Sequence, residues 1–221
     1  MTDSFMLATR IPMSREGFER WLDTPAPGPD AIANPEAMFD GWFWDGRRAG
    51  SEWESAVVGR TPRRFFAGRV RESCAGRPHD TVLLHRDGAL EAYLFHLGYV
   101  ESSVHTALLM FAAAGAFRTE PGEDAVLFWA ETSGGLPDPD WDGWLSVLSV
   151  GDSGARFSGA IDLTAAVTGL RPVENRFFGM VERLAEEEES WGDDSDGPYR
   201  TAAPRDPSFV DPAVLADAAS R

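Results

Sequence analysis

The residues best suited to binding in this sequence are acidic and gather near the end of a predicted helix. Between residues 182 and 196 the only basic side chain is Arg183. Consecutive glutamates at a helix C-terminus oppose the helix dipole, at about 0.3–1 kcal/mol per exposed charge. Local stability therefore does not account for the run, which is either a solvated helix end or a surface held for a basic partner. The acidic residues are Glu182, Glu186, Glu187, Glu188, Glu189, Asp193, Asp194 and Asp196.

Four tryptophans lie outside any periodic pattern, in segments rich in Gly and Asp: Trp42, Trp44, Trp141 and Trp144. Indole rings in such segments either cover a core beneath a loop or, when exposed, anchor an interface. Acidic neighbours, at Asp40 and Asp140 for example, would give an exposed indole a negative rim. We predict that these tryptophans and the acidic run form a partner-binding surface.

Alternate carboxylates at Asp138, Asp140 and Asp142, followed by Gly143, have a spacing that lets side chains converge on one cation. This spacing resembles the start of an EF-hand calcium loop, with Leu145 at the apolar position. However, Ser149 stands where that family has a bidentate glutamate, and the flanking segments are typical of strands. The pattern therefore favours an acidic turn, and no metal site is predicted.

The run Gly151-Asp152-Ser153-Gly154 resembles the nucleophile segment of chymotrypsin-like serine proteases. The sequence departs from that family at Ala155, and no residue is identifiable as the base that the serine would need. A run of this composition between two strands is favourable turn chemistry instead. We interpret it as a turn.

The histidines do not predict a metal or catalytic site. A hairpin register would place His79 across from His96, where two imidazoles could share a transition metal, but no further ligand completes a set. His105 falls on an apolar helix and is expected to be a core or boundary residue. No catalytic residue and no cofactor is predicted, and enzymatic activity is not favoured.

Composition limits the classes of partner. The chain has 221 residues and a formal net charge of −16, which disfavours direct binding to nucleic acid or anionic membranes. All 20 basic residues are arginine, as in proteins encoded by GC-rich bacterial genomes. The single Cys74 suits a reducing compartment. The longest apolar stretch, residues 107–117, is about half a membrane span. We expect a cytoplasmic, bacterial protein.

The strongest local structure signal is Asp87-Gly88 between two β-prone runs, residues 81–86 and 89–97. It predicts a hairpin with a two-residue turn, in which Leu83 pairs with Ala92 and Val82 with Tyr93. A helix that uses Leu90, Leu94 and Leu97 is the competing interpretation.

Other elements follow from periodicity. Strands are predicted at residues 4–11, 64–71, 124–131, 144–150 and 155–161. Helices are predicted after Ser14, over residues 100–117, over a short stretch from Asp162 that ends near Gly169, over residues 172–191, and finally over residues 211–219. The arginines of residues 60–77 are expected to pair with acids of the same molecule.

These elements predict an α+β fold, a mostly antiparallel sheet packed by helices in one domain of residues 1–191. An acidic Gly/Pro-rich tail with a short helix would follow over residues 192–221. The expected function is that of an acidic binding protein, most simply an immunity protein or antitoxin that captures a basic protein such as a toxin. The alternatives are a small-molecule enzyme with a Trp-lined pocket and a structural or assembly component of a larger complex.

Overall fold

The chain folds into a six-stranded antiparallel sheet with helices on both faces, which confirms the predicted α+β class. The computed structural model describes residues 4–39, 53, 59–73, 80–97, 101–131, 135–138, 145–158, 162–190 and 205–216. The strand order is β2-β3-β1-β4-β5-β6. The strands are β1 (Ser4–Pro12), β2 (Thr81–Arg86), β3 (Ala89–Leu94), β4 (Glu123–Glu131), β5 (Leu145–Gly151) and β6 (Gly154–Phe157).

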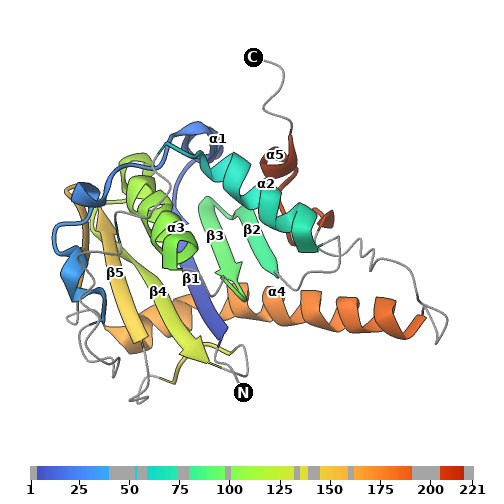
Figure 1. The fold of residues 1–221 in the computed structure, drawn as a ribbon. Coiled ribbons are helices and arrows are strands. Elements are labelled where there is room, and N and C mark those ends of the chain that lie inside the picture. Colours follow the sequence, from blue (N-terminus) through green and yellow to red (C-terminus); the bar gives the residue numbers. More distant parts are fainter. Residues whose placement is uncertain are drawn as a thin grey trace.

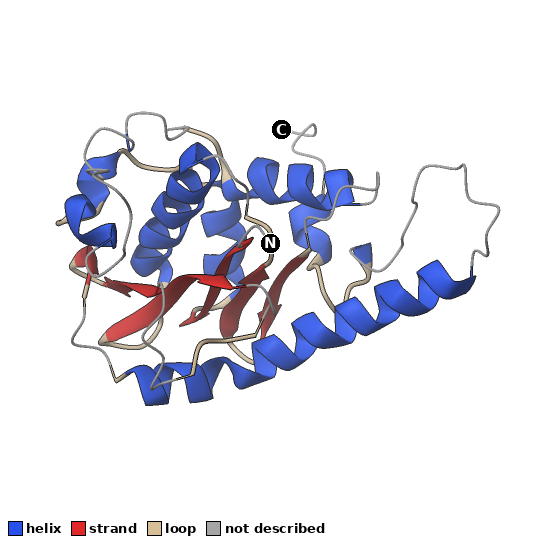
Figure 2. Cartoon of the chain, turned by 60° about the horizontal axis from the view of Figure 1, so that its bottom comes forward, coloured by secondary structure: helices blue, strands red, loops and turns tan. Residues whose placement is uncertain are grey.

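Two layers of helices enclose the sheet. On one face lie α1 (Arg15–Asp23), α2 (Pro62–Ser73) and α3 (Glu101–Ala114), whereas α4 (Leu163–Ser190) crosses the other face (Figures 1 and 2). The remaining helices are short: the 3-10 helices η1 (Pro29–Ala31), η2 (Pro35–Phe39) and η4 (Gly115–Phe117), and α5 (Pro212–Leu215). Among the described residues, no helix has both the length and the apolar character that crossing a bilayer requires.

The hairpin of β2 and β3 forms with the predicted register. Leu83 pairs with Ala92 and Val82 with Tyr93. Asp87 and Gly88 form the turn with φ of 48° and 70°, the left-handed values that a two-residue turn of this type needs. The ladder ends at Thr81–Leu94. The proposed pairing of His79 and His96 is outside it, since His96 adopts φ 48° after the strand, and His79 lies outside the described residues.

The first helix layer is held together by aromatic rings. Ser14 caps α1 by accepting a hydrogen bond from Gly17 N, as expected, and Trp21 reaches the centre of the layer. The Trp21 ring lies 5.8 Å from that of Phe111 in α3 and 6.2 Å from that of Phe66 in α2. Each helix thus contributes one ring to the same buried cluster.

Two predicted elements were wrong. Residues 64–71 belong to helix α2, because Phe66, Arg69 and Val70 fall on one buried face at helical spacing. The predicted break near Gly169 does not occur either, and α4 runs unbroken through Pro172. Both residues lie on the exposed side, so the buried stripe on the opposite side is continuous.

Segments of the same chain cover both edges of the sheet. At β6, Ala33 N donates to Ala155 O at 2.9 Å, and the amide of Asn34 bonds both backbone groups of Phe157. At β2, Val210 forms a parallel bridge with Leu83. The boundary predicted between residues 191 and 192 stays a prediction, while residues 205–216 pack against the edge of the sheet.

Candidate partner-binding surface

Helix α4 carries the part of the predicted binding surface that the structure describes. Asp162 caps the helix, because Ala165 N donates to its carboxylate at 3.0 Å. An apolar stripe then packs on the sheet, and the Phe177 ring stacks on Tyr93 at 4.6 Å. The stripe consists of Val167, Leu170, Val173, Phe177 and Met180, all buried.

Buried ion pairs fix the rotation of α4 about its axis. Glu91 in β3 is 2% exposed, and Arg176 Nη2 lies 2.9 Å from its carboxylate. Arg10 Nε approaches the same carboxylate at 3.7 Å. Glu174, also buried, accepts a hydrogen bond from Leu136 N at 2.7 Å. Because an unpaired buried charge is costly, these contacts determine which side of α4 faces solvent.

The outer face of α4 combines an aromatic side chain with carboxylates. Phe178 is 37% exposed, more than any other large hydrophobic residue among those described. Glu182 and Glu186 follow at spacings of four residues, so the three side chains share one exposed stripe. Sequence analysis missed Phe178. The sequence did contain an indication of it: Phe178 is aromatic but out of phase with the apolar stripe to which its neighbour Phe177 belongs.

The C-terminal part of α4 extends past β2 at the edge of the sheet (Figures 1 and 2). Here Arg183 turns toward the segment that follows α4: it pairs with Asp206, and its guanidinium lies 5.0 Å from the Phe209 ring centre. Neither Glu182 nor Glu186 forms an ion pair with another described residue. The described part of this surface is therefore negative.

The predicted site residues differ in exposure, and several lie outside the described residues. Glu182 and Glu186 are exposed, whereas Glu187 is half-buried. Glu188 and Glu189 belong to α4, but their side chains are outside the described set. The four tryptophans and the three aspartates are outside it as well: Trp42, Trp44, Trp141, Trp144, Asp193, Asp194 and Asp196. Their role as anchors and steering charges stays a prediction.

The arginines of α2 contact the same molecule, in part as expected. Arg63 Nε donates to Asp23 at 2.6 Å. Arg69 instead donates to the backbone carbonyls of Phe95, His96 and Leu97. Burial lowers the pKa of Arg69 to about 10. These two guanidinium groups therefore make contacts that stabilise the fold.

A cavity of about 370 Å³ lies between the N-terminal half of α4 and strands β1 and β4. Its charged lining comprises Arg10, Glu123, Asp124 and Asp162, and three alanines, Gly169 and Leu170 complete the wall. A hydrogen bond from Ser149, with help from Arg156, holds the pKa of Glu123 below its usual value. Burial raises the pKa of Asp124, although Arg118 donates to its carboxylate at 2.6 Å.

The described histidines do not line this cavity. His105 is buried in α3, as expected, and its ring stacks on Trp53 at 4.2 Å. His85 Nε2 donates to Met13 O at 2.9 Å. In the ranges that the structure covers, no three His, Cys, Asp or Glu side chains are placed to hold a metal ion.

The two motifs with family resemblances differ in outcome. Gly151-Asp152-Ser153-Gly154 forms the tight turn of the β5–β6 hairpin, and Ser153 is exposed at its tip. Of the carboxylate loop, Asp138 is exposed, whereas Asp140, Asp142 and Gly143 lie outside the described residues. The turn interpretation of the first motif is therefore confirmed.

Comparisons with protein-family models, with curated protein sequences and with solved structures found no match to this chain.

Proposed function

We propose that this protein is an acidic binding protein that captures a basic protein partner, as an immunity protein or antitoxin does with a cationic toxin. One observation carries the proposal. The outer stripe of α4 presents Phe178, Glu182 and Glu186 together on a helix that extends past the sheet. The formal net charge of −16 gives the whole molecule the same sign of potential.

The parts of this stripe have separate physical roles. Unpaired surface carboxylates attract a positive partner over distances of about 10 Å at moderate salt and raise the association rate. An exposed aromatic ring buries apolar area in the complex and slows dissociation. The buried pair of Glu91 and Arg176 holds the helix in one orientation, so little conformational freedom is lost on binding.

Charge reversal tests the steering role. Affinity capture from native lysate at low salt supplies the basic partner, and its association kinetics are then measured with the purified proteins. We expect Glu182→Lys with Glu186→Lys to lower the association rate about tenfold at low salt and to flatten its salt dependence. Phe178→Ala should instead raise the dissociation rate, by an amount equivalent to about 1–2 kcal/mol.

The matched control reverses two exposed acids away from α4, Glu16 and Glu36, which changes net charge equally. We expect it to have a much smaller effect on association. Equal effects of the two double variants would show that only net charge matters. No loss of association rate in the α4 variant would refute the proposal.

The cavity beside α4 favours a second candidate, a small-molecule site. Its lining holds one guanidinium and three carboxylates, so it offers groups for proton transfer. Gly169→Leu should fill this space, because a Cβ at Gly169 meets no atom within 4 Å. An activity abolished by that substitution, with partner capture intact, would support an enzyme.

A further inference from the structure

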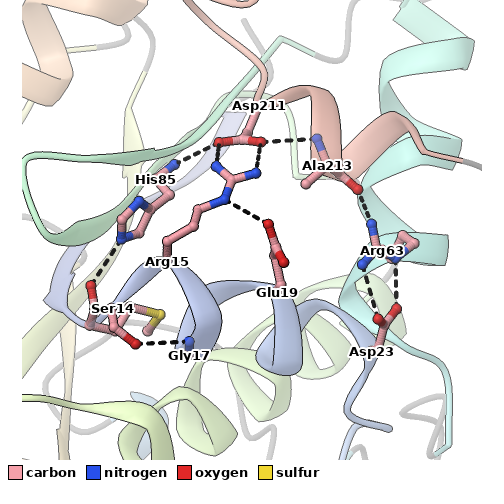
Figure 3. Close-up of polar contacts among 10 residues, drawn as sticks. Ser14, Arg15, Gly17, Glu19, Asp23, Arg63, His85, Asp211 and Ala213 are labelled. Atoms are coloured by element: carbon pink, nitrogen blue, oxygen red, sulfur yellow. Dashed lines mark hydrogen bonds and ion pairs between the residues drawn. The ribbon is translucent and has the colours of Figure 1, made fainter.

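The edge of strand β2 is covered by a segment from the far end of the described chain, residues 205–216, here called the strap. Leu83 N donates to Phe209 O at 2.9 Å, and Asp211 N donates to Leu83 O at 2.8 Å. The Asp211 carboxylate accepts a longer hydrogen bond from His85 N, at 3.4 Å (Figure 3). The strap therefore occupies backbone groups of β2 that another strand would otherwise use.

Arginines from three helices hold the strap in place. Arg15 of α1 donates to both oxygens of Asp211, at 2.5 and 3.0 Å (Figure 3). Arg63 of α2 donates to Ala213 O, and Arg183 of α4 pairs with Asp206. Three strap side chains are buried beneath these contacts: Phe209, Val210 and Val214.

The covered edge is complementary to itself. Because the Leu83 N–H and C=O both point outward, two β2 strands can pair antiparallel about a two-fold axis at Leu83. That register sets Thr81 opposite His85 and Asp80 opposite Arg86, at both ends of the pair. Opposite charges directly across such a pair are favourable. Val82, Leu83 and Leu84 are apolar, and an uncovered strand edge of such residues is prone to association.

We propose that the strap is an autoinhibitory cover, held by Asp211 and Phe209, over a self-association surface on β2. When the strap is displaced, two copies of the chain pair through their β2 edges and join their sheets. This surface lies at a different position from the outer stripe of α4, and the inference does not depend on the proposed function.

The test uses the full chain with Asp211→Ala and Phe209→Ala, while Asp211→Asn alone serves as a milder variant if the double variant is poorly folded. Hydrogen exchange at Leu83 N reports release of the strap in dilute samples that are monomeric, and analytical ultracentrifugation reports the mass over a series of concentrations. We expect Leu83 N to lose protection in the dilute monomer, and to regain it as the concentration is raised and the dimer forms. A synthetic peptide of residues 205–216, added in trans, should return the variant to monomer.

Substitutions at Arg86 test the register, since this side chain is exposed. In the released variant, Arg86→Gln should weaken the dimer, and Arg86→Glu, which sets like charges opposite each other at both ends, should weaken it at least about tenfold. Arg64→Glu, on the exposed side of α2, makes the same change in net charge and should have little effect.

Three results would overturn the inference. The first is a variant that stays monomeric although Leu83 exchanges freely. The second is protection at Leu83 that survives both substitutions in the dilute monomer, because Asp211 and Phe209 would then not hold the cover. The third is a dimer whose strength is the same in the Arg86→Gln and Arg86→Glu variants, which would indicate non-specific aggregation.

Discussion

Breaking the buried pair between Glu91 and Arg176 should destabilise the protein more than removing both partners. Arg176→Met leaves a carboxylate that is 2% exposed without its close partner. Loss of one member of a buried pair costs about 3–5 kcal/mol. We expect the lower end, about 3 kcal/mol, because Arg10 Nε remains 3.7 Å away and can approach. For a chain of this size, that is a fall in Tm of about 6–12 °C.

The double variant Glu91→Leu with Arg176→Met replaces the pair by apolar groups, and its free energy of unfolding should lie within about 1 kcal/mol of the wild type. Urea denaturation followed by circular dichroism measures both variants. Arg156→Met is the control, since Arg156 and its partner Glu123 are both exposed and such pairs contribute about 0–1 kcal/mol. A double variant that is no more stable than Arg176→Met alone would refute the reasoning.

Two further predictions concern pH and packing. Burial acts to raise the pKa of Asp211, but hydrogen bonds from Arg15 and Ala213 N outweigh it and the pKa lies below its usual value. Stability from such a group is present above the unfolded pKa of about 3.9 and is lost as pH falls through the folded value. Asp211→Asn should thus reduce the loss of unfolding free energy between about pH 6 and about pH 2, and an unchanged loss would contradict this assignment. Gly169→Ala should raise thermal stability by about 0.5–1 kcal/mol, since its Cβ meets open space. Gly115→Ala should lower it, because its Cβ would lie 2.6 Å from Gly151 O; melting curves in the reverse order would count against this packing.

Local sequence signals predicted the hairpins well. The Asp87-Gly88 turn tolerates positive φ at both positions, and a two-residue turn fixes the register of every pair that follows. Helix α2 was missed because clustered arginines blur its periodicity, and its buried face becomes evident only when α1 packs against it. The continuity of α4 was missed because Pro172 and Gly169 are read as breakers, although tertiary packing on the sheet overrides them.

Less of the candidate site than of the fold could be predicted from the sequence. The acidic run predicted Glu182 and Glu186 as surface charges, because unpaired carboxylates at a helix end need no tertiary contact. The exposed ring of Phe178 required knowing which side of α4 meets the sheet. That depends on the pair of Arg176 with Glu91, two residues 85 positions apart in sequence. The contact of Arg15 with Asp211 joins residues 196 positions apart, a separation at which no local pattern operates.

The amide of Asn34, which bonds both backbone groups of Phe157, is followed by Pro35. Spontaneous deamidation of asparagine proceeds through attack by the next backbone nitrogen, and proline has no N–H with which to begin it. Conversion to aspartate would turn the donor that faces Phe157 O into a second acceptor and so repel that carbonyl. The residue that seals the β6 edge is thus shielded, by its neighbour, from the ageing reaction that would open it.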